Sequence, residues 1–439
     1  MARAAIHWAV ALLLLPGATT AWARPAESQP PEAFPSDVAS VWFDTLYDVV
    51  KQEKTQPPPA SRIYGITGVA LYEAVVGGSS RNRPLGGQLN DLDPLPSPKP
   101  RALHWPTVAN SALATTVRGL YPNASQLSID LINARELEFA SLYRKDVSES
   151  SYERSVKLGQ EVARRTLEWA ATDGYSVHNN CRYTPAQARG PWKPTPPTFS
   201  TSPSQPCWGE LRTMALKSGE ECAAPGPPSY STEPSSEYYK AALEVRDVGA
   251  HLTAEQKTIA EYWADGPGAT GTPPGHWIAI VGQIARNNRL SLMAAAEAYA
   301  RVGVAVHDAF IVCWHIKYVA NLQRPVTYIR FYIDPTWGPY LPTPPFPTYV
   351  SGHSTQSGAA STVLTDQFGA LAFTDTTHAD HGLVPWQHSR SFSSFEAAAD
   401  EAAVSRLYGG IHFAFDNDDG LTSGQCVGEA IRRRVHFKR

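Results

Sequence analysis

Residues 405–416 read SRLYGGIHFAFD and place a guanidinium and an imidazole on either side of two adjacent glycines. Six positions separate Arg406 from His412, which is roughly 600° of rotation on a straight helix, so the two side chains would point apart. Gly409 and Gly410 interrupt the helical pattern between them, because glycine is typical of helix ends. We therefore expect Arg406 and His412 to face one site.

Two further clusters lie upstream of this segment. Lys317 and Arg324 stand where a long apolar helix is expected to end, and SGH, residues 351–353, immediately precedes another expected helix. Each cluster alone has a plain structural explanation, namely a basic helix C-terminus, a helix N-cap or a surface ion pair. Together, Lys317, Arg324 and Arg406 are three cations in a chain with only 18% charged residues.

These residue types predict a cradle for a tetrahedral oxyanion. Guanidinium groups bind such anions through paired hydrogen bonds, and lysine adds a mobile charge. Gly352 allows close backbone approach, and its N–H would lie at a helix N-terminus, where anions are favoured. Ser351 adds a hydroxyl donor, and His353 can exchange protons near neutral pH. We expect one histidine to act as ligand or nucleophile and the other as acid or base.

The composition excludes several other classes of protein. With 43% hydrophobic residues and low charge, the chain is not of the disordered type. The net charge of −3 and the lack of long basic runs argue against a nucleic-acid partner. No spacing of cysteine and histidine is typical of a zinc site. The histidines at 378, 381 and 388 are interpreted as solvated loop residues.

Apolar periodicity predicts an all-α fold with long Pro-rich loops, since 37 prolines leave few uninterrupted strands. The prolines at 57–59 are expected to end the first helix, and residues 174–233 to drape over the helices and shape an entrance. The expected helices cover residues 37–51, 61–77, 105–120, 125–143, 149–172, 235–247, 253–264, 275–286, 289–318, 354–369, 394–408 and 420–434.

The N-terminus and the cysteines indicate export. Residues 1–23 have the pattern of a signal peptide with cleavage near Ala23, and no membrane span is expected in the mature chain. Three of the five cysteines lie in the loop at 174–233, where one disulfide is expected. Cys207–Cys222 is the preferred pair, although connectivity does not follow from sequence. Cys313 and Cys426 are expected to be buried thiols.

The three clusters resemble the active-site motifs of vanadium-dependent haloperoxidases, which share their site with type-2 phosphatidic acid phosphatases. The spacings K-x6-R-P and S-R-x5-H-x3-D match in full, whereas Val350 stands where the superfamily usually has proline. The likeness extends through residues 61–64, 261–266 and 272–275, and exported bacterial members are the most similar. It implies a single helical domain over 24–439, built from two four-helix-bundle-like units, with the catalytic motifs in 314–416.

The resemblance also implies roles for individual residues. His412 would ligate vanadium, His353 would act as acid and base on hydrogen peroxide, and Lys317 would polarise the bound peroxide. Asp265 would pair with an active-site arginine, which we expect to be Arg406, and Asp416 would support the site or cap a helix. The expected vanadate-oxygen contacts are Lys317, Arg324, Ser351, Gly352, His353 and Arg406.

Trp314 and Phe346 match aromatic residues on the halide side of fungal chloroperoxidases, although Trp314 at helical spacing could equally be plain core. The expected activity is vanadate-dependent oxidation of chloride or bromide by hydrogen peroxide to a hypohalous acid, which reacts with an organic acceptor. The relatives also suggest a homodimer.

Two alternatives stay open at this point. The same cradle without vanadate could serve a secreted acid phosphatase, with His412 attacking phosphorus and His353 protonating the leaving group. A periplasmic oxyanion-binding protein is the third, but pure binding has little use for a titrating base such as His353.

Overall fold

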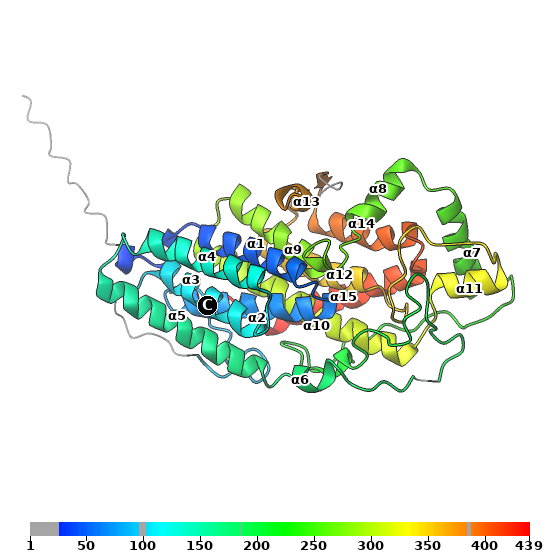
Figure 1. Cartoon of the computed structure of the whole chain (residues 1–439), viewed down its shortest axis with the longest axis horizontal. Coiled ribbons are helices and arrows are strands. Elements are labelled where there is room, and N and C mark those ends of the chain that lie inside the picture. Colours follow the sequence, from blue (N-terminus) through cyan, green and yellow to red (C-terminus); the bar gives the residue numbers. More distant parts are fainter. Residues whose placement is uncertain (1–25, 96–101, 186, 384–387) are drawn as a thin grey trace, which may run out of the picture.

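The structure is a computed structural model that describes residues 26–95, 102–185, 187–383 and 388–439 (Figure 1). The expected signal peptide therefore lies outside the described residues. Besides three 3-10 helices of three residues each, these segments contain fifteen α-helices and one antiparallel pair of three-residue strands, which confirms the all-α fold class. Their bounds are α1 (Asp37–Gln52), α2 (Pro57–Val76), α3 (Trp105–Leu120), α4 (Gln126–Tyr143), α5 (Glu149–Ala170), α6 (Tyr175–His178), α7 (Glu237–Ala250), α8 (Ala254–Tyr262), α9 (Thr272–Asn287), α10 (Leu292–Ala320), α11 (Pro325–Tyr332), α12 (Gly352–Phe368), β1 (Phe373–Asp375), α13 (Thr377–Asp380), β2 (Arg390–Phe392), α14 (Phe395–Tyr408) and α15 (Ala414–Arg434).

The helices form two groups that share α10. Helices α1 to α5 and α9 pack in one half of the elongated molecule, whereas α12, α14 and α15 pack in the other (Figure 1). Helix α10 contacts α2 in the first group and α12 and α15 in the second. A Cβ on Gly65 of α2 would lie 2.9 Å from the carbonyl oxygen of Gly303 of α10, so both helices need glycine for this close approach.

Helices α12 and α15 also approach each other closely, like α2 and α10. A Cβ on Gly424 of α15 would lie 2.0 Å from the carbonyl oxygen of Thr355 of α12. At the end of this contact, the backbone N–H of Ser351 donates to the carbonyl oxygen of Asp416 at 2.8 Å. The small residues of α15 thereby bring the third predicted cluster against the second.

Most expected helices are present, with three informative differences. The prolines at 57–59 begin α2 rather than end α1, because proline in the first helical turn leaves no intrahelical hydrogen bond unmade. Helix α15 begins at Ala414, six residues before the expected start at 420. Helix α11 is absent from the expected helices, since its eight residues, which begin at Pro325 directly after Arg324, are too few to show a long apolar period.

The irregular segment at 174–233 lies against the loops that lead to the predicted site. The N–H of Trp192 donates to the carbonyl oxygen of Asn321 at 2.9 Å, and that of Ser204 to Pro345 at 3.0 Å. The side chain of Tyr328 donates to the carbonyl oxygen of Ser231 at 2.7 Å. This agrees with the expectation that the segment covers the helices near the site.

The predicted Cys207–Cys222 disulfide is wrong. Cys181 pairs with Cys207, and Cys222 pairs with Cys426 of α15, so Cys426 is not a thiol. Cys313 is a free buried thiol, as expected. The error arose because Cys426 is 204 residues from its partner, and proximity across that distance is set by tertiary packing.

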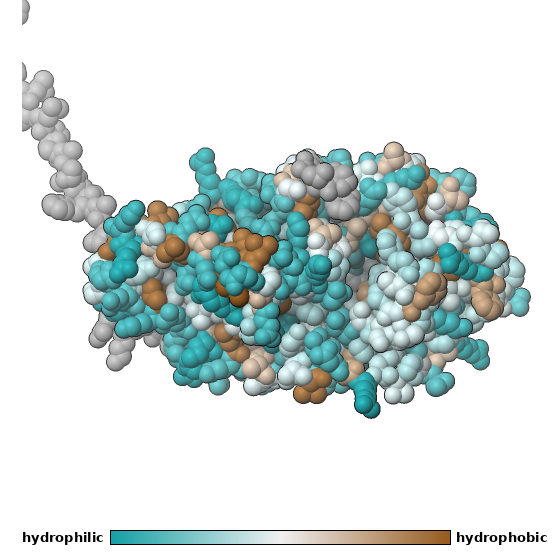
Figure 2. All heavy atoms as spheres, in the orientation of Figure 1, coloured by the Kyte–Doolittle hydropathy of each residue, from teal (hydrophilic) through white to brown (hydrophobic). Residues whose placement is uncertain are grey.

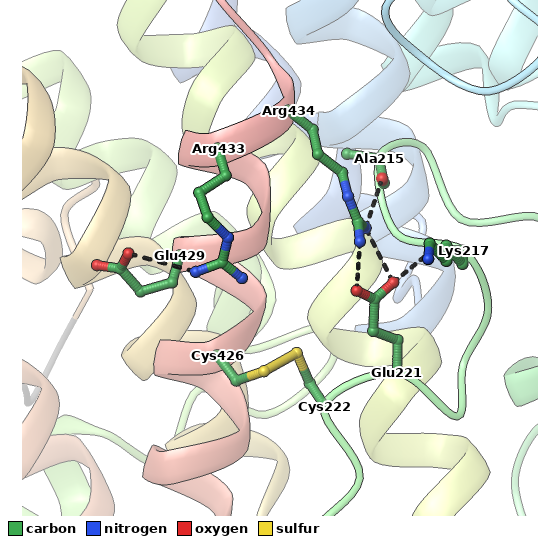
Figure 3. The surroundings of a disulfide bond; sticks show 8 residues. All are labelled: Ala215, Lys217, Glu221, Cys222, Cys426, Glu429, Arg433 and Arg434. Carbon is green, nitrogen blue, oxygen red and sulfur yellow. Dashed lines mark hydrogen bonds and ion pairs between the residues drawn. A yellow bond between two sulfur atoms is a disulfide. The ribbon is translucent and has the colours of Figure 1, made fainter.

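An ion pair accompanies the Cys222–Cys426 bond (Figure 3). Arg434 of α15 donates from Nη1 to Glu221 at 2.9 Å, and the backbone N–H of Lys217 donates to the same carboxylate at 2.7 Å. The disulfide and this ion pair together fix the 174–233 segment to α15, the helix whose first turn carries Asp416.

Helix α10 is long and apolar enough to cross a membrane by length and composition, and 89% of its most apolar window is buried within the protein. The face in Figure 2 is mostly hydrophilic, with small, separate hydrophobic areas. A charge-poor chain thus keeps its apolar side chains largely inside.

Candidate active site

The structure brings the three predicted clusters to one place. They come from the end of α10, the loop before α11, the start of α12, the end of α14 and the turn before α15. Within the cluster the cations are almost completely buried, whereas Gly352 and His353 are partly exposed. The residues that meet there are Lys317, Arg324, Ser351, Gly352, His353, Arg406 and His412.

His412 is held by contacts on both ring nitrogens. Its Nδ1 lies 2.9 Å from Asp416 Oδ2 and 3.1 Å from Thr348 Oγ1, and its Nε2 lies 3.1 Å from Arg324 Nη1. The carboxylate accepts a hydrogen bond from Nδ1–H, so Nε2 carries the lone pair and presents it to the arginine. Burial, and then the charges of Arg324, Lys317 and the other cations, hold the pKa of His412 well below its usual range. It is therefore a neutral imidazole.

Asp416 supports both His412 and the start of α15. Its carboxylate accepts hydrogen bonds from the Phe413 backbone N–H at 3.1 Å and from the Thr348 hydroxyl. Burial raises its pKa to about 6, while the Thr348 hydrogen bond and the charge of Lys317 oppose the rise. The geometry is that of a cap and of a support for the site. Thr348 was missed, since an isolated threonine carries no sequence signal.

Two guanidinium groups point unpaired nitrogen atoms into this region. Arg324 donates to the carbonyl oxygens of Phe346 and Ile411, both at 2.8 Å, and its Nη2 has no partner among the described residues. Arg406 donates to the Trp263 carbonyl at 3.0 Å, and its Nε is likewise without a described partner. Burial lowers the pKa of Arg324 to about 9 and that of Arg406 to about 10, so both are cations at neutral pH.

His353 offers a third unpaired nitrogen atom. Its Nε2 is buried without a described partner, while a hydrogen bond to the Trp263 backbone favours its protonated form. Burial and the charge of Arg406 outweigh that contact and hold its pKa well below the usual range. Unpaired buried donors on Arg324 and Arg406 are costly unless an anion satisfies them, so this donor set fits a bound oxyanion such as vanadate.

Lys317 differs from the expected arrangement. Its ammonium donates to the carbonyl oxygens of Pro347, at 3.1 Å, of Thr348, at 2.8 Å, and of Val350. An ammonium has three N–H donors, so all of them hold the loop that leads into the SGH motif. Burial lowers its pKa to about 8. In this structure Lys317 therefore shapes the loop of residues 347–350 and has no spare donor for an oxyanion.

Ser351 and Gly352 form the start of α12. Ser351 is its N-cap, and the serine hydroxyl accepts a hydrogen bond from the Ser354 N–H at 3.4 Å. Gly352 is the first helical residue, and a Cβ there would touch the Trp314 ring at 3.4 Å. The N-terminus of α12 thus lies at the cluster, as expected for an anion site.

The expected Asp265–Arg406 pair is not formed as a direct hydrogen bond. Asp265 Oδ2 instead lies 2.7 Å from His276 Nδ1, and its Oδ1 has no described partner. The negative charge of Asp265 still raises the pKa of Arg406, against the larger effect of burial. The prediction failed because His276, eleven residues away on α9, competes for the carboxylate and was not recognised as a partner.

Two further predictions concern an aromatic pair and a histidine near the site. Trp314 and Phe346 lie together, with ring centroids 5.1 Å apart, and Lys317 Nζ is 5.2 Å from the Phe346 ring. Their halide role stays a prediction. His378 is buried and its Nε2 lies 2.7 Å from the Tyr262 carbonyl oxygen, so the interpretation as a solvated loop histidine is wrong.

The sequence of this protein is similar to those of known haloperoxidases. Residues 297–438 match the family described as the second helical-bundle domain of VCPO. Vanadium chloroperoxidase of Curvularia inaequalis is 28% identical over 213 residues, 35% of this chain and 35% of that protein. Vanadium-dependent bromoperoxidase of Ascophyllum nodosum is 29% identical over 165 residues, 34% of this chain and 26% of that protein. The chain thus matches about a third or less of the length of these curated relatives.

Solved structures agree over nearly the whole chain. A bacterial vanadium-dependent chloroperoxidase in its holo form has a TM-score of 0.62 at 19% identity and covers 94% of this chain and 97% of its own, which shows the fold. The structure described as the first bacterial vanadium-dependent iodoperoxidase has a TM-score of 0.85 at 34% identity, covering 92% of this chain and 97% of its own. With that identity over that length, and with the buried cradle in place, this chain belongs to the vanadium-dependent haloperoxidase family.

Proposed function

We propose that this protein binds vanadate and uses hydrogen peroxide to oxidise a halide to hypohalous acid, which then halogenates an organic acceptor. The observation that carries the proposal is the set of unpaired, buried nitrogen atoms on Arg324, Arg406 and His353. Arg324 contacts the neutral His412, and Arg406 and His353 are close enough to lower the pKa of His412. Family membership selects vanadate among the oxyanions that such a cradle could hold.

The residues that would hold vanadate follow from the donors they offer. In this structure the lone pair of His412 Nε2 faces Arg324 Nη1 at 3.1 Å, and it would become available to vanadate once that guanidinium donates to the anion instead. The guanidinium groups of Arg324 and Arg406 would supply charge-assisted hydrogen bonds, and the α12 N-terminus would supply Ser351 and Gly352. Bound vanadate would supply a Lewis-acidic centre that activates peroxide towards attack by halide without a change in oxidation state.

The remaining chemistry belongs to side chains of this protein. His353 is neutral at neutral pH because burial lowers its pKa, and its Nε2 has no described partner. This nitrogen can therefore accept a proton from hydrogen peroxide and return it when the hypohalous acid leaves. Lys317 keeps the loop of residues 347–350 in place through three backbone carbonyls. Trp314 and Phe346 form an apolar wall beside these cations, where a halide would be partly desolvated.

Iodide is the halide we expect to be oxidised fastest, with bromide and chloride behind it. Iodide loses electrons most readily of the three, and the similarity to a bacterial iodoperoxidase extends over nearly the whole chain. The bacterial chloroperoxidase structure covers as much of this chain but at 19% identity, against 34% for the iodoperoxidase. The curated chloroperoxidase and bromoperoxidase are matched over about a third of this chain.

A halogenation assay tests the proposal. Purified protein would be loaded with vanadate, dialysed and supplied with hydrogen peroxide, one halide and a dimedone acceptor whose absorbance falls on halogenation. We expect turnover that depends on vanadate and peroxide and is lost in His412→Ala. Vanadate-inhibited hydrolysis of a phosphomonoester without any halogenation would overturn the proposal in favour of an acid phosphatase.

We also propose export of the protein after cleavage near Ala23. The two disulfides among the described residues support an oxidising compartment. When the protein is produced in a bacterial host, N-terminal sequencing of the exported fraction should give Arg24 first. Protein that stays inside the cells and keeps Met1 would contradict export. The homodimer stays a prediction that light scattering would test.

A further inference from the structure

Behind the oxyanion cradle lies a buried chain of two carboxylates and one imidazole. His276 of α9 has its Nδ1 at 2.7 Å from Asp265 Oδ2 and its Nε2 at 2.7 Å from Asp375 Oδ2 of β1. All three side chains have 0% exposure. The indole of Trp263 stacks on the imidazole, with centroids 4.5 Å apart and planes 20° from parallel. The ring of His276 is therefore fixed on its edges and on one face.

The distances show that the imidazole of this hydrogen-bonded chain of side chains is charged. A neutral imidazole has one N–H, yet both nitrogens of His276 lie at donor distance from carboxylate oxygens, so both donate and the ring is an imidazolium. Burial opposes that charge, but Asp265 and Asp375 together raise the pKa of His276 to about 10. The two carboxylates, the imidazolium and the Arg406 guanidinium sum to zero, which is the condition for burying so many ions together.

The other titratable groups around His276 do not compete for its role. The rings of Tyr262 and His378 lie 5.4 Å and 5.2 Å from it. Burial lowers the pKa of His378 and raises that of Tyr262, so neither carries charge at neutral pH. Asp265, His276 and His378 have the loose spacing of a metal site. Because carboxylates occupy both nitrogens of His276, the geometry is that of a hydrogen-bonded chain instead.

The hydrogen-bonded side chains of Asp265, His276 and Asp375 hold the turn at 263–265, which orients two residues of the cradle. The Trp263 carbonyl accepts a hydrogen bond from Arg406 at 3.0 Å and one from His353. Two residues later, Asp265 has a positive φ of 45°, and its charge favours the cationic forms of both Arg406 and His353. Asp375 anchors the far end through the Thr377 backbone N–H at 2.9 Å.

We propose that His276, bridging Asp265 and Asp375, is a positioning residue that fixes the 263–265 turn and thereby aims Arg406 and His353 at the bound oxyanion. The inference rests on the proposed function, since it assumes that the cradle binds vanadate. No substrate contact is assigned to His276. It acts through the Trp263 carbonyl and the Asp265 carboxylate.

Two variants and one control test the inference. In His276→Gln the side chain is uncharged, so it cannot bridge Asp265 and Asp375 as a cation. Asp375→Asn removes one negative charge and keeps the shape of the side chain. The matched control is His381→Gln, because His381 also contacts a carboxylate, Asp48 at 3.2 Å, but lies outside the cradle. Each full-length protein is titrated with vanadate by calorimetry, which needs no turnover.

We expect His276→Gln and Asp375→Asn to weaken vanadate binding on the order of 10- to 100-fold, with the control unchanged. We also expect the Michaelis constant for peroxide to rise in both variants more than in the control. Folded variants that bind vanadate as tightly as the wild type would overturn the inference. Wild-type protein that binds no vanadate at all would instead overturn the proposed function.

A spectroscopic measurement keeps the test open if both variants fail to fold. Nitrogen-15 NMR of wild-type protein with labelled histidine should show one imidazole with both nitrogens protonated at pH 8, where an ordinary histidine is neutral. The absence of any doubly protonated imidazole at that pH would overturn the inference. His353 and His412 do not confuse the assignment, since burial and nearby cations lower the pKa of each.

Discussion

His412 Nδ1 lies 2.9 Å from Asp416 Oδ2, and this contact determines which ring nitrogen faces the cradle. Nδ1 keeps its proton and donates it in a hydrogen bond to the carboxylate, so the lone pair of Nε2 points to Arg324. The two residues are four apart, on either side of the point where α15 begins. One carboxylate thus caps the helix and fixes the tautomer of the expected vanadium ligand.

Asp416→Asn should weaken vanadate binding on the order of 10- to 100-fold, because an amide no longer enforces protonation of His412 at Nδ1. The measurement is calorimetric titration with vanadate, with unfolding curves to show that the variant is folded. Asp418→Asn, an exposed position one turn into the same helix, is the matched control. Unchanged affinity in folded Asp416→Asn would show that the contact does not set the orientation of His412.

Lys317→Met should destabilise the protein even without vanadate. The substitution leaves the carbonyl oxygens of Pro347, Thr348 and Val350 buried without their donor, at a cost of roughly 3 kcal/mol or more in the free energy of unfolding. Urea unfolding of the vanadate-free protein measures this cost. If the variant lost vanadate binding at undiminished stability, Lys317 would act on the anion directly and not through the loop.

The cradle could be predicted from sequence because its members stand in three short motifs, whereas its supports could not. Arg324, Arg406 and His412 lie in short motifs whose residue types and spacing can be recognised in the sequence. Asp375 lies 99 residues from His276, and only the packing of β1 beside α9 joins them. A lone aspartate in a loop-like segment gives no signal of that contact.

The same distinction holds for the fold. Long helices such as α10 follow from their apolar period and caps. The helix expected from residue 354 after the SGH motif is also present, and it begins two residues earlier, at Gly352. The pairing of Cys222 with Cys426 depends on where the 174–233 segment crosses α15, which no local pattern encodes. Short elements such as α11 are likewise set by their surroundings, because eight residues hold too few periods to be read.

Glu73 of α2 should make stability depend on pH. Burial raises the pKa of this carboxyl from about 4.5 to about 7, against a hydrogen bond from the Leu85 backbone N–H. The folded state therefore favours the protonated acid, and the stability it contributes is fully present below pH 4.5 and is lost as pH rises through 7. The loss at pH 8 should be about 3.5 kcal/mol, from 2.5 pKa units at 1.4 kcal/mol each.

Glu73→Gln tests this dependence, because glutamine stays neutral and can still accept the Leu85 hydrogen bond. The variant should melt at a higher temperature than the wild type at pH 8 and at the same temperature near pH 4. Glu138→Gln, an exposed residue of α4, is the control and should show no such divergence. Parallel melting curves for Glu73→Gln and the wild type across this range would contradict the prediction.

The two disulfides should contribute unequally to stability. Cys222–Cys426 closes 204 residues of chain and Cys181–Cys207 only 26, and the loss of unfolded-state entropy grows with loop length. The chain-entropy relation gives about 5 kcal/mol for the first and about 3.5 kcal/mol for the second. The double variant Cys222→Ser/Cys426→Ser should therefore unfold at lower urea than Cys181→Ser/Cys207→Ser.

The double variant Cys222→Ser/Cys426→Ser also releases the 174–233 segment from α15, so it should weaken vanadate binding as well, because Asp416 and the cradle lie at the start of that helix. Equal midpoints for the two double variants would show that packing of the segment, including the Glu221–Arg434 ion pair, holds it in place without the covalent bond.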